Sequence, residues 1–321
     1  MISKKPVALF AFSHPWTQEM MLKAAPPDFE VRFLENRDEQ TLQRELPFAD
    51  LFVTTFLPAK WVPLLKRCKL VQHQGVGYDD IDVEALTEAG IPFAITPDGT
   101  VIGVAEHTIL FILALSKQLV QVHNGMNRGE EFDPMLWRPN SHFFYGRTLG
   151  IVGFGRIGRR VGRLVRSFEV ELIYYDVIRA PESLERELNA KYMPFQKLLT
   201  ISDVISVHTP LTSETEGLFG KGEFARMKPG AFFINTGRGG TYDMDALYEN
   251  LKSGHLGGAG LDVYNPEPPP MDHPIFQLPN VICTPHMATG TVEAHIAKAE
   301  AQFNNLRRVL RGEEPHNLVK I

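Results

Sequence analysis

The chain has 321 residues, of which 44% are hydrophobic and 22% are charged, and its formal net charge at pH 7 is -5. That length exceeds one ordinary compact domain and suits two, and the composition is globular, which excludes a largely disordered chain. The acidic balance gives no electrostatic reason to expect binding to nucleic acid or to an acidic membrane surface, so we expect a soluble, cytoplasmic protein.

Short β-rich runs alternate with helical patterns in the first hundred residues. The predicted strands are residues 7–12, 31–34, 51–54, 70–74 and 93–95. The clearest helix, residues 82–89, begins at Asp82 and is followed by Gly90, which are favoured residue types at the two ends of a helix. Such alternation predicts a parallel sheet covered by helices on both faces, so this segment forms a small α/β unit.

A second series of strands begins near Thr148 and comprises residues 149–152, 171–175, 204–207, 232–235, 259–263 and 281–283. A helix of about residues 101–121, followed by an arm rich in glycine, proline and aromatic residues, separates the two series. A last helix, of about residues 291–310, has apolar positions at helical spacing and is expected to pack on the first unit. The pattern predicts two α/β units with a cleft between them.

Neither cysteines nor apolar runs point to a secreted, metal-binding or membrane protein. Cys68 and Cys283 are too few for a disulfide framework and lie in no metal-ligand spacing, so we expect reduced thiols and no metal. The apolar runs 7–12 and 109–115 fall far short of the roughly 20 residues of a membrane span. They predict a buried strand and a buried helix.

The sequence GFGRIG at residues 153–158 follows a predicted strand and opens a helix that runs to about residue 168. In that context the motif indicates a dinucleotide site. Its first glycine permits a tight turn, its second a close approach of the pyrophosphate, and its third close packing of helix on strand. The N–H groups at the helix start then face the phosphates. The predicted cofactor contacts in this loop are Gly153, Gly155, Arg156, Ile157 and Gly158.

Asp176 ends the next strand, 18 residues after Gly158. An acidic residue there accepts hydrogen bonds from the adenosine ribose hydroxyls and repels a 2′-phosphate, which favours NAD over NADP. The neighbouring Arg179 weakens this preference because a cation would attract that phosphate. Glu169 stands at the left-handed position between helix and strand, where glycine is usual.

Three segments with reactive side chains each follow a predicted strand of the second series, and they contain Arg238, Glu267 and His286. Ligands of open parallel sheets gather at the carboxyl ends of the strands, so the three can converge. Hydride transfer to a keto acid leaves an alkoxide, which a histidine can protonate. A carboxylate would orient that imidazole, and an arginine would bind the substrate carboxylate. Each residue alone suits a structural role, but together, behind a dinucleotide motif, they favour catalysis.

These segments resemble the D-isomer-specific 2-hydroxyacid dehydrogenase family over essentially the whole chain. The matching stretches are GVGYDDID at 75–82, VAEHT at 104–108, GFGRIG at 153–158, VHTPLT at 207–212, NTGRG at 235–239, LDV at 261–263, PEP at 266–268, HP at 273–274 and TPHMA at 284–288. The resemblance implies a Rossmann-type NAD-binding domain, residues 100–290, inserted into a smaller flavodoxin-like α/β substrate domain, residues 1–99 and 291–321. It also implies a homodimer, with residues 137–145 in an arm around the partner.

The resemblance also implies roles for the site residues. His286 would be the acid/base, Glu267 its partner and Arg238 the substrate anchor, while the N–H groups of Val76 and Gly77 would complete the carboxylate cradle across the cleft. The further cofactor contacts that it implies are Thr108, His208, Thr209, Pro210, Thr236, Gly237 and Asp262. By contrast, we expect His107 only to pack on its apolar helix.

Departures from relatives narrow the substrate. Formate-oxidising members have Gln in place of Glu267, and phosphite oxidisers have Lys in place of Val76. Phosphoglycerate dehydrogenases usually carry a basic residue after the third strand, where this chain has Thr-Thr-Phe-Leu at 54–57, although Lys60 is near. The chain also ends about where their regulatory domains begin. We therefore expect a small 2-keto acid similar to glyoxylate or hydroxypyruvate. The alternatives are a phosphoglycerate dehydrogenase-like enzyme and a dinucleotide-sensing, corepressor-like scaffold.

Overall fold

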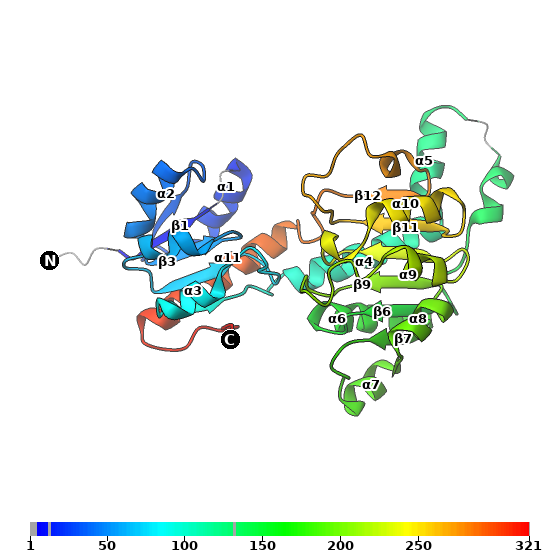
Figure 1. Ribbon diagram of the computed structural model, residues 1–321. Coiled ribbons are helices and arrows are strands. Elements are labelled where there is room, and N and C mark those ends of the chain that lie inside the picture. Colours follow the sequence, from blue (N-terminus) through cyan, green and yellow to red (C-terminus); the bar gives the residue numbers. More distant parts are fainter. Residues whose placement is uncertain (1–4, 12–13, 131–132, 321) are drawn as a thin grey trace. The chain divides into compact units, whose positions relative to one another are not determined.

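The computed structural model describes residues 5–11, 14–130 and 133–320, and the chain divides into two compact units (Figure 1). Unit 1 comprises Met1–Thr100 and Gly290–Ile321, and unit 2 comprises Val101–Thr289. Unit 2 is therefore an insertion between two parts of unit 1. Each unit is built on its own parallel sheet, which confirms the predicted α/β class.

The sheet of unit 1 has five parallel strands in the order β2-β1-β3-β4-β5. This is the flavodoxin-like order, as predicted. The strands are β1 (Val7–Phe10), β2 (Glu30–Phe33), β3 (Leu51–Thr54), β4 (Leu70–His73) and β5 (Phe93–Ala94). The helices are α1 (Pro15–Ala24), α2 (Glu39–Glu45), α3 (Val83–Glu88) and α11 (Val292–Leu310), with short 3-10 turns at η1 (Leu46–Phe48) and η2 (Ala59–Leu64).

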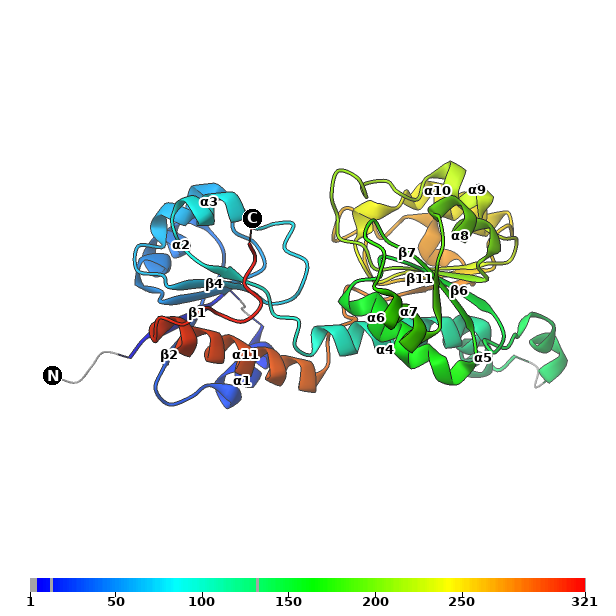
Figure 2. The ribbon, with the colours of Figure 1, turned by 90° about the horizontal axis from the view of Figure 1, so that it is seen from below.

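The two faces of this sheet are covered by different helices. Figure 2 shows α1 and α11 side by side on one face and α2 and α3 on the other. Successive strand residues point to opposite faces, so Ala8 and Phe10 join the α11 side whereas Leu9 joins the other core. From α11, Phe303 packs on Phe10 with ring centroids 5.8 Å apart. The prediction that the last helix returns to the first unit is confirmed.

The sheet of unit 2 has seven parallel strands in the order β12-β11-β10-β9-β6-β7-β8. The chain builds outward from β6 to β8, then returns to place β9 on the other side of β6. This reversal is the switch point of a Rossmann-type sheet, as predicted. The strands are β6 (Thr148–Val152), β7 (Glu171–Tyr175), β8 (Ala190–Tyr192), β9 (Val204–Val207), β10 (Phe232–Asn235), β11 (Gly258–Leu261) and β12 (Val281–Cys283).

Helices cover both faces of this sheet as well. One face packs on α4 and α6 through a core that includes Phe111, Ile112 and Val161, and the other packs on α8, α9 and α10 (Figure 2). The helices are α4 (Thr100–Ser116), α5 (Leu119–Asn127), α6 (Arg156–Val165), α7 (Glu182–Leu188), α8 (Phe195–Ile201), α9 (Lys221–Arg226) and α10 (Met244–Lys252). The 3-10 turns are η3 (Pro134–Leu136), η4 (Arg138–Asn140), η5 (Arg166–Phe168), η6 (Gly239–Thr241) and η7 (Pro274–Gln277).

The single helix predicted for residues 101–121 is wrong, because the chain forms α4 and α5 with a break between them. Gln118 at the break has a left-handed backbone, φ 51°, and its side chain donates a 2.9 Å hydrogen bond to the Trp137 carbonyl oxygen. The break therefore ties the helix to the following arm. Within the described ranges, no helix alone has the length and hydropathy of a membrane span, although α4 and α5 reach them as a pair bent by 63°.

Candidate active site

The reactive side chains predicted from sequence all follow the carboxyl ends of strands in unit 2. Arg238 follows β10, Glu267 lies in the loop after β11, and His286 follows β12. These three strands are neighbours in the sheet. Parallel strands present their carboxyl ends at one edge, so the sheet itself gathers the three segments.

His286 and Glu267 form a directly hydrogen-bonded pair. Nδ1 of His286 lies 2.7 Å from Oε2 of Glu267, and Oε1 of Glu267 accepts a 2.9 Å bond from the Tyr264 N–H. Burial tends to raise the pKa of Glu267, but the bonds from His286 and Tyr264, with the nearby charge of Arg238, outweigh it and lower this pKa. An ionised carboxylate fixes the proton on Nδ1, and Nε2 hydrogen-bonds to no described residue, so it can serve a reactant.

Two buried tyrosines near this pair were missed by sequence reasoning. The hydroxyl of Tyr264 lies 3.0 Å from the carbonyl oxygens of both Leu261 and Thr284, so it links the ends of β11 and β12. The hydroxyl of Tyr242 donates to the Val263 carbonyl oxygen at 3.1 Å. Burial is the main cause that raises the pKa of each phenol, which keeps both neutral donors. They brace the backbone that carries Glu267.

The loop that carries Arg238 is braced by polar side chains. Oδ1 of Asn235 accepts the Gly237 N–H at 2.9 Å, and its Nδ2 donates to Oγ1 of Thr241 at 3.0 Å. That hydroxyl in turn donates to the Arg238 carbonyl oxygen at 2.7 Å. Thr241 is fully buried, and sequence reasoning gave it no role.

The glycine-rich loop has the geometry that a pyrophosphate needs. Gly153 has φ 92°, and a Cβ there would lie 2.7 Å from the Thr209 nitrogen. A Cβ on Gly158 would collide with the Gly153 carbonyl oxygen and lie 3.0 Å from Cγ2 of Ile151, so α6 packs closely on β6. At Gly155 a Cβ would meet no described atom within 4 Å, which leaves open space before the first N–H groups of α6. Arg156 begins α6, and Ile157 packs partly against the core.

Asp176 and Arg179 lie after β7 and have different partners. Oδ2 of Asp176 accepts the Phe154 N–H of the glycine loop at 2.7 Å, and Oδ1 accepts the Ile178 N–H at 3.2 Å. Arg179 makes two 2.9 Å bonds to Glu185. The bond from Arg179, aided by one from Tyr174, lowers the pKa of Glu185 to about 2. Because Glu185 pairs with Arg179, the carboxylate of Glu185 balances the positive charge of the guanidinium. Arg179 therefore does not offset the negative charge of Asp176.

A row of polar side chains links α4 to the segments that follow β9 and β10, and two of its members, Thr108 and Thr236, are buried. Oγ1 of Thr108 lies 3.1 Å from Oγ1 of Thr236, which lies 3.4 Å from Nδ1 of His208. Burial lowers the pKa of His208 to about 3, so the ring is neutral. Oγ1 of Thr209 is buried and has no hydrogen-bond partner in the described part of the chain. A bound cofactor would satisfy that atom. Pro210 follows, its carbonyl oxygen accepting from the Thr215 hydroxyl.

The Val76–Gly77 segment lies in unit 1, directly after β4. The preceding Gly75 is anchored: its N–H donates to Nδ1 of His73, and its carbonyl oxygen accepts the Thr96 N–H, both at 2.9 Å. The N–H groups of Val76 and Gly77 donate to no described residue. They are available to a ligand.

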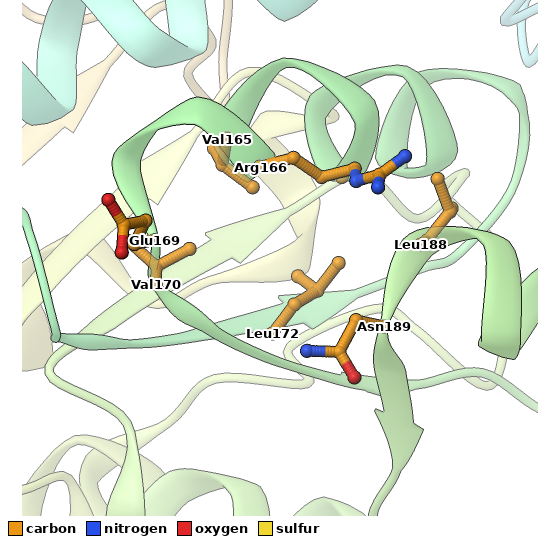
Figure 3. Close-up of a pocket in the computed structure, with 8 residues that line it drawn as sticks. Val165, Arg166, Glu169, Val170, Leu172, Leu188 and Asn189 are labelled. Carbon is orange, nitrogen blue, oxygen red and sulfur yellow. The ribbon is translucent and has the colours of Figure 1, made fainter.

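A cavity of about 360 Å³ lies in unit 2 at the far end of α6 from the glycine loop (Figure 3). Its lining includes Val165, Arg166, Glu169, Leu172 and Asn189, none of which is a predicted site residue. Glu169 has the left-handed conformation expected from the sequence, φ 52°. Among the described residues, no group of three or more His, Cys, Asp or Glu side chains is arranged to hold a metal ion.

Several known proteins are similar to this chain. Residues 109–288 match the family model of the D-isomer specific 2-hydroxyacid dehydrogenase NAD binding domain. A glyoxylate reductase of Korarchaeum cryptofilum is 40% identical over 256 residues, which are 79% of this chain and 76% of the relative. A D-3-phosphoglycerate dehydrogenase of Archaeoglobus fulgidus is 33% identical over 96% of this chain and 58% of its own length. A glyoxylate reductase structure from Paecilomyes thermophila has a TM-score of 0.82 and 29% identity, and covers 98% of both chains.

Proposed function

Since the chain belongs to the D-isomer-specific 2-hydroxyacid dehydrogenase family and is an NAD-dependent oxidoreductase, we propose that it reduces glyoxylate, hydroxypyruvate or a similarly small 2-keto acid. The observation that carries this proposal is the 2.7 Å bond between His286 and Glu267 at the strand ends that also bear Arg238. The glyoxylate reductases among the relatives support a small substrate.

In this proposal His286 donates the proton. Its Nε2 gives a proton to the carbonyl oxygen of the keto acid as the alkoxide forms, and Glu267, bound to Nδ1, stabilises the imidazolium and fixes the tautomer. Arg238 binds the substrate carboxylate and draws charge from the reacting carbonyl. The reduced nicotinamide supplies the hydride when it is bound. In the oxidative direction His286 accepts the proton instead.

The residues that would hold NAD are those of the glycine loop and the polar side chains of Thr108, His208, Thr209 and Thr236. We propose that the first N–H groups of α6 face the pyrophosphate beside Gly155 and that Asp176 accepts the ribose hydroxyls. The unpartnered hydroxyl of Thr209 and the open space at Gly155 support this placement. The ion pair between Arg179 and Glu185 supports a preference for NAD over NADP.

We propose unit 1 as the substrate domain, with the N–H groups of Val76 and Gly77 as further donors to the substrate carboxylate. Their lack of acceptors in the described residues supports this role. Phe56, about half exposed after β3, gives that strand end an apolar character, which favours a small acid over a phosphorylated one. A phosphoglycerate dehydrogenase-like activity stays the alternative because of the relative from Archaeoglobus fulgidus.

We also propose a homodimer formed through unit 2, working in the cytoplasm. Large apolar side chains are exposed along α4, α5 and the arm, among them Leu110, Leu119, Leu136, Phe143 and Tyr145. Large exposed apolar side chains gathered in one part of the chain favour an interaction surface. The two free thiols, Cys68 and Cys283, suit a reducing compartment.

The test is NADH oxidation followed at 340 nm with glyoxylate, hydroxypyruvate, pyruvate, 2-ketogluconate and 3-phosphohydroxypyruvate, with NADPH in parallel. The proposal expects the highest kcat/KM for glyoxylate or hydroxypyruvate with NADH. A preference for 3-phosphohydroxypyruvate would replace it with the phosphoglycerate alternative. Tight NADH binding without turnover of any acid would instead favour a dinucleotide-sensing role.

A further inference from the structure

We propose that His107 is a positioning residue for His286, acting through a chain of hydrogen bonds that runs from its imidazole to Thr284 and on to Asp262. This inference rests on the proposed catalytic role of His286. All four residues belong to unit 2. His107, on α4, is far from His286 in the sequence and was expected only to pack.

The direction of the chain follows from the number of protons. Oγ1 of Thr284 donates to Oδ1 of Asp262 at 2.6 Å, which uses its only hydrogen. Nε2 of His107 lies 3.0 Å from the same hydroxyl oxygen, so the imidazole must be the donor. Burial lowers the pKa of His107, against the opposing charge of Asp262, which favours the neutral ring. The tautomer is therefore the one protonated on Nε2.

The ring of His107 is also held from its other side. It packs edge-on against Phe111, with centroids 4.5 Å apart and ring planes at 79°. Phe111 is 1% exposed and belongs to the core between α4 and the sheet. Packing against the core therefore restricts the imidazole of His107 to one orientation. A donor that is fixed in this way can orient the Thr284 hydroxyl.

At the other end of the chain, Asp262 holds the backbone on both sides of His286. Its carbonyl oxygen accepts the His286 N–H at 2.8 Å, while Oδ1 accepts the Met287 N–H at 2.8 Å and Oδ2 the Ala288 N–H at 2.9 Å. Asp262 is 1% exposed. Its carboxylate therefore defines the position of the turn that carries the histidine.

That turn needs external support. His286 has φ 50°, a left-handed conformation that is unfavourable for residues other than glycine. Such conformations persist only where the surroundings over-determine them. The Thr284 hydroxyl, aligned by His107, helps to fix the carboxylate that closes the turn. Removing the His107 donor would leave the Thr284 hydroxyl freer to rotate. The turn would then hold the His286 ring, and with it Nε2 of His286, less firmly.

The effect on turnover should be large, although His107 touches neither substrate nor cofactor in this proposal. A displacement of reacting groups by about 1 Å can cost roughly 100-fold in rate. We expect His107→Phe to lower kcat about tenfold and to leave the KM for the keto acid and the Kd for NADH within about twofold. His107→Gln, whose amide can still donate to Thr284, should recover most of the loss.

The experiment combines activity with a signal that does not depend on activity. Side-chain ¹⁵N–¹H spectra of the full chain, with the His286 resonances assigned by comparison with His286→Gln, are recorded for wild type, His107→Phe, His107→Gln and Thr284→Val. The His286 signals should shift in His107→Phe and Thr284→Val and return towards wild type in His107→Gln. His255→Phe is the matched control, since His255 is also partly buried in unit 2 and its imidazole hydrogen-bonds, among the described residues, only to the Phe224 carbonyl oxygen.

A double-mutant cycle completes the test. Because His107 and Thr284 act in one chain, kcat for His107→Phe with Thr284→Val should be no lower than for the worse single variant. The proposal would be overturned if the His286 signals did not shift in His107→Phe. It would also be overturned if the losses in kcat of the two single variants multiplied in the double variant, or if His107→Gln did not recover kcat. If wild type reduces no keto acid, the proposed function fails, while the spectra still decide whether His107 positions His286.

Discussion

The imidazole of His286 has one nitrogen hydrogen-bonded to Glu267 and one that hydrogen-bonds to no described residue. If Nε2 is the proton donor, His286→Ala should lower kcat by about 10²- to 10⁴-fold. NADH should bind as before, because the glycine loop and Asp176 are untouched. Stopped-flow turnover and NADH fluorescence titration on the same preparation check this. A variant that keeps more than a tenth of the wild-type kcat would remove His286 from its proposed role.

The preference for NAD over NADP should also depend on single residues. Asp176→Ala should reduce the preference for NAD over NADP by about 10- to 100-fold, since a hydrogen bond to a charged group contributes roughly 1.5–3 kcal/mol. Adding Glu185→Gln should improve NADPH use further, because it weakens the hold on Arg179. The measurement is kcat/KM with each cofactor. An Asp176→Ala enzyme with unchanged preference would assign the selectivity to another group.

At the scale of elements, α11 buries three polar side chains in unit 1, of which Asn305 donates a hydrogen bond to the His316 carbonyl oxygen and Lys298 and Gln302 are less well partnered. Lys298 is 4% exposed, has no carboxylate partner among the residues described, and has its pKa lowered by burial to about 8. One turn further along, the amide of Gln302 is buried without a hydrogen-bond partner in the same part of the structure. Burying Lys298 and Gln302 in this way costs free energy. The packing of α11 must therefore be stabilised by its apolar side chains, chiefly those of Phe303 and Leu306.

Replacing Lys298 should therefore stabilise the protein. The unfolded chain binds the lysine proton more tightly than the folded one, so the ammonium opposes folding below about pH 8, and this cost fades as pH rises towards 10.5. Lys298→Met should add up to about 3 kcal/mol at pH 7 and much less at pH 10. Thermal unfolding at both pH values measures the difference. A gain that is equal at the two would point to packing instead of charge.

Local sequence patterns predicted every strand in the described residues except β8, with bounds that agree within two residues. The bounds of β3, β7, β9, β10 and β12 match the predicted ranges, because apolar runs delimit these strands. The break between α4 and α5 was missed, because it depends on a bond from Gln118 to a residue far along the chain. The edge strand β8 is only three residues long and carries little signal.

The same distinction applies to the site. The strand ends that bear Arg238 and His286 could be predicted, since parallel topology brings such ends together. The supporting bonds could not, because the partners of Tyr264 and Thr241 are backbone carbonyl oxygens whose positions only the folded structure defines. His107 was classed as a packing residue for the same reason. The edge-on contact of His107 with Phe111 agrees with a packing role. Its hydrogen bond to Thr284 is an additional interaction that the sequence did not predict.

At the scale of the whole molecule, the exposed apolar side chains of α4, α5 and the arm should lie in a subunit interface. Leu119→Glu combined with Phe143→Glu should convert a dimer into a monomer at micromolar concentration, because each would bury an unpaired charge. Phe48→Glu is the control, since Phe48 is about as exposed but lies in unit 1. Sedimentation velocity gives the answer. If the wild type is itself monomeric, the proposed dimer is wrong.

The insertion of unit 2 imposes an order on folding during synthesis. The core of unit 1 includes Ala299, Phe303 and Leu306 of α11, which the ribosome makes only after all of unit 2. At about 5–20 residues per second the first hundred residues wait roughly 10 to 40 s for that helix. Meanwhile the sheet face around Ala8, Phe10 and Val53 lacks its main cover. The nascent first unit should thus be a chaperone client while the second, whose sequence is continuous, is already folding.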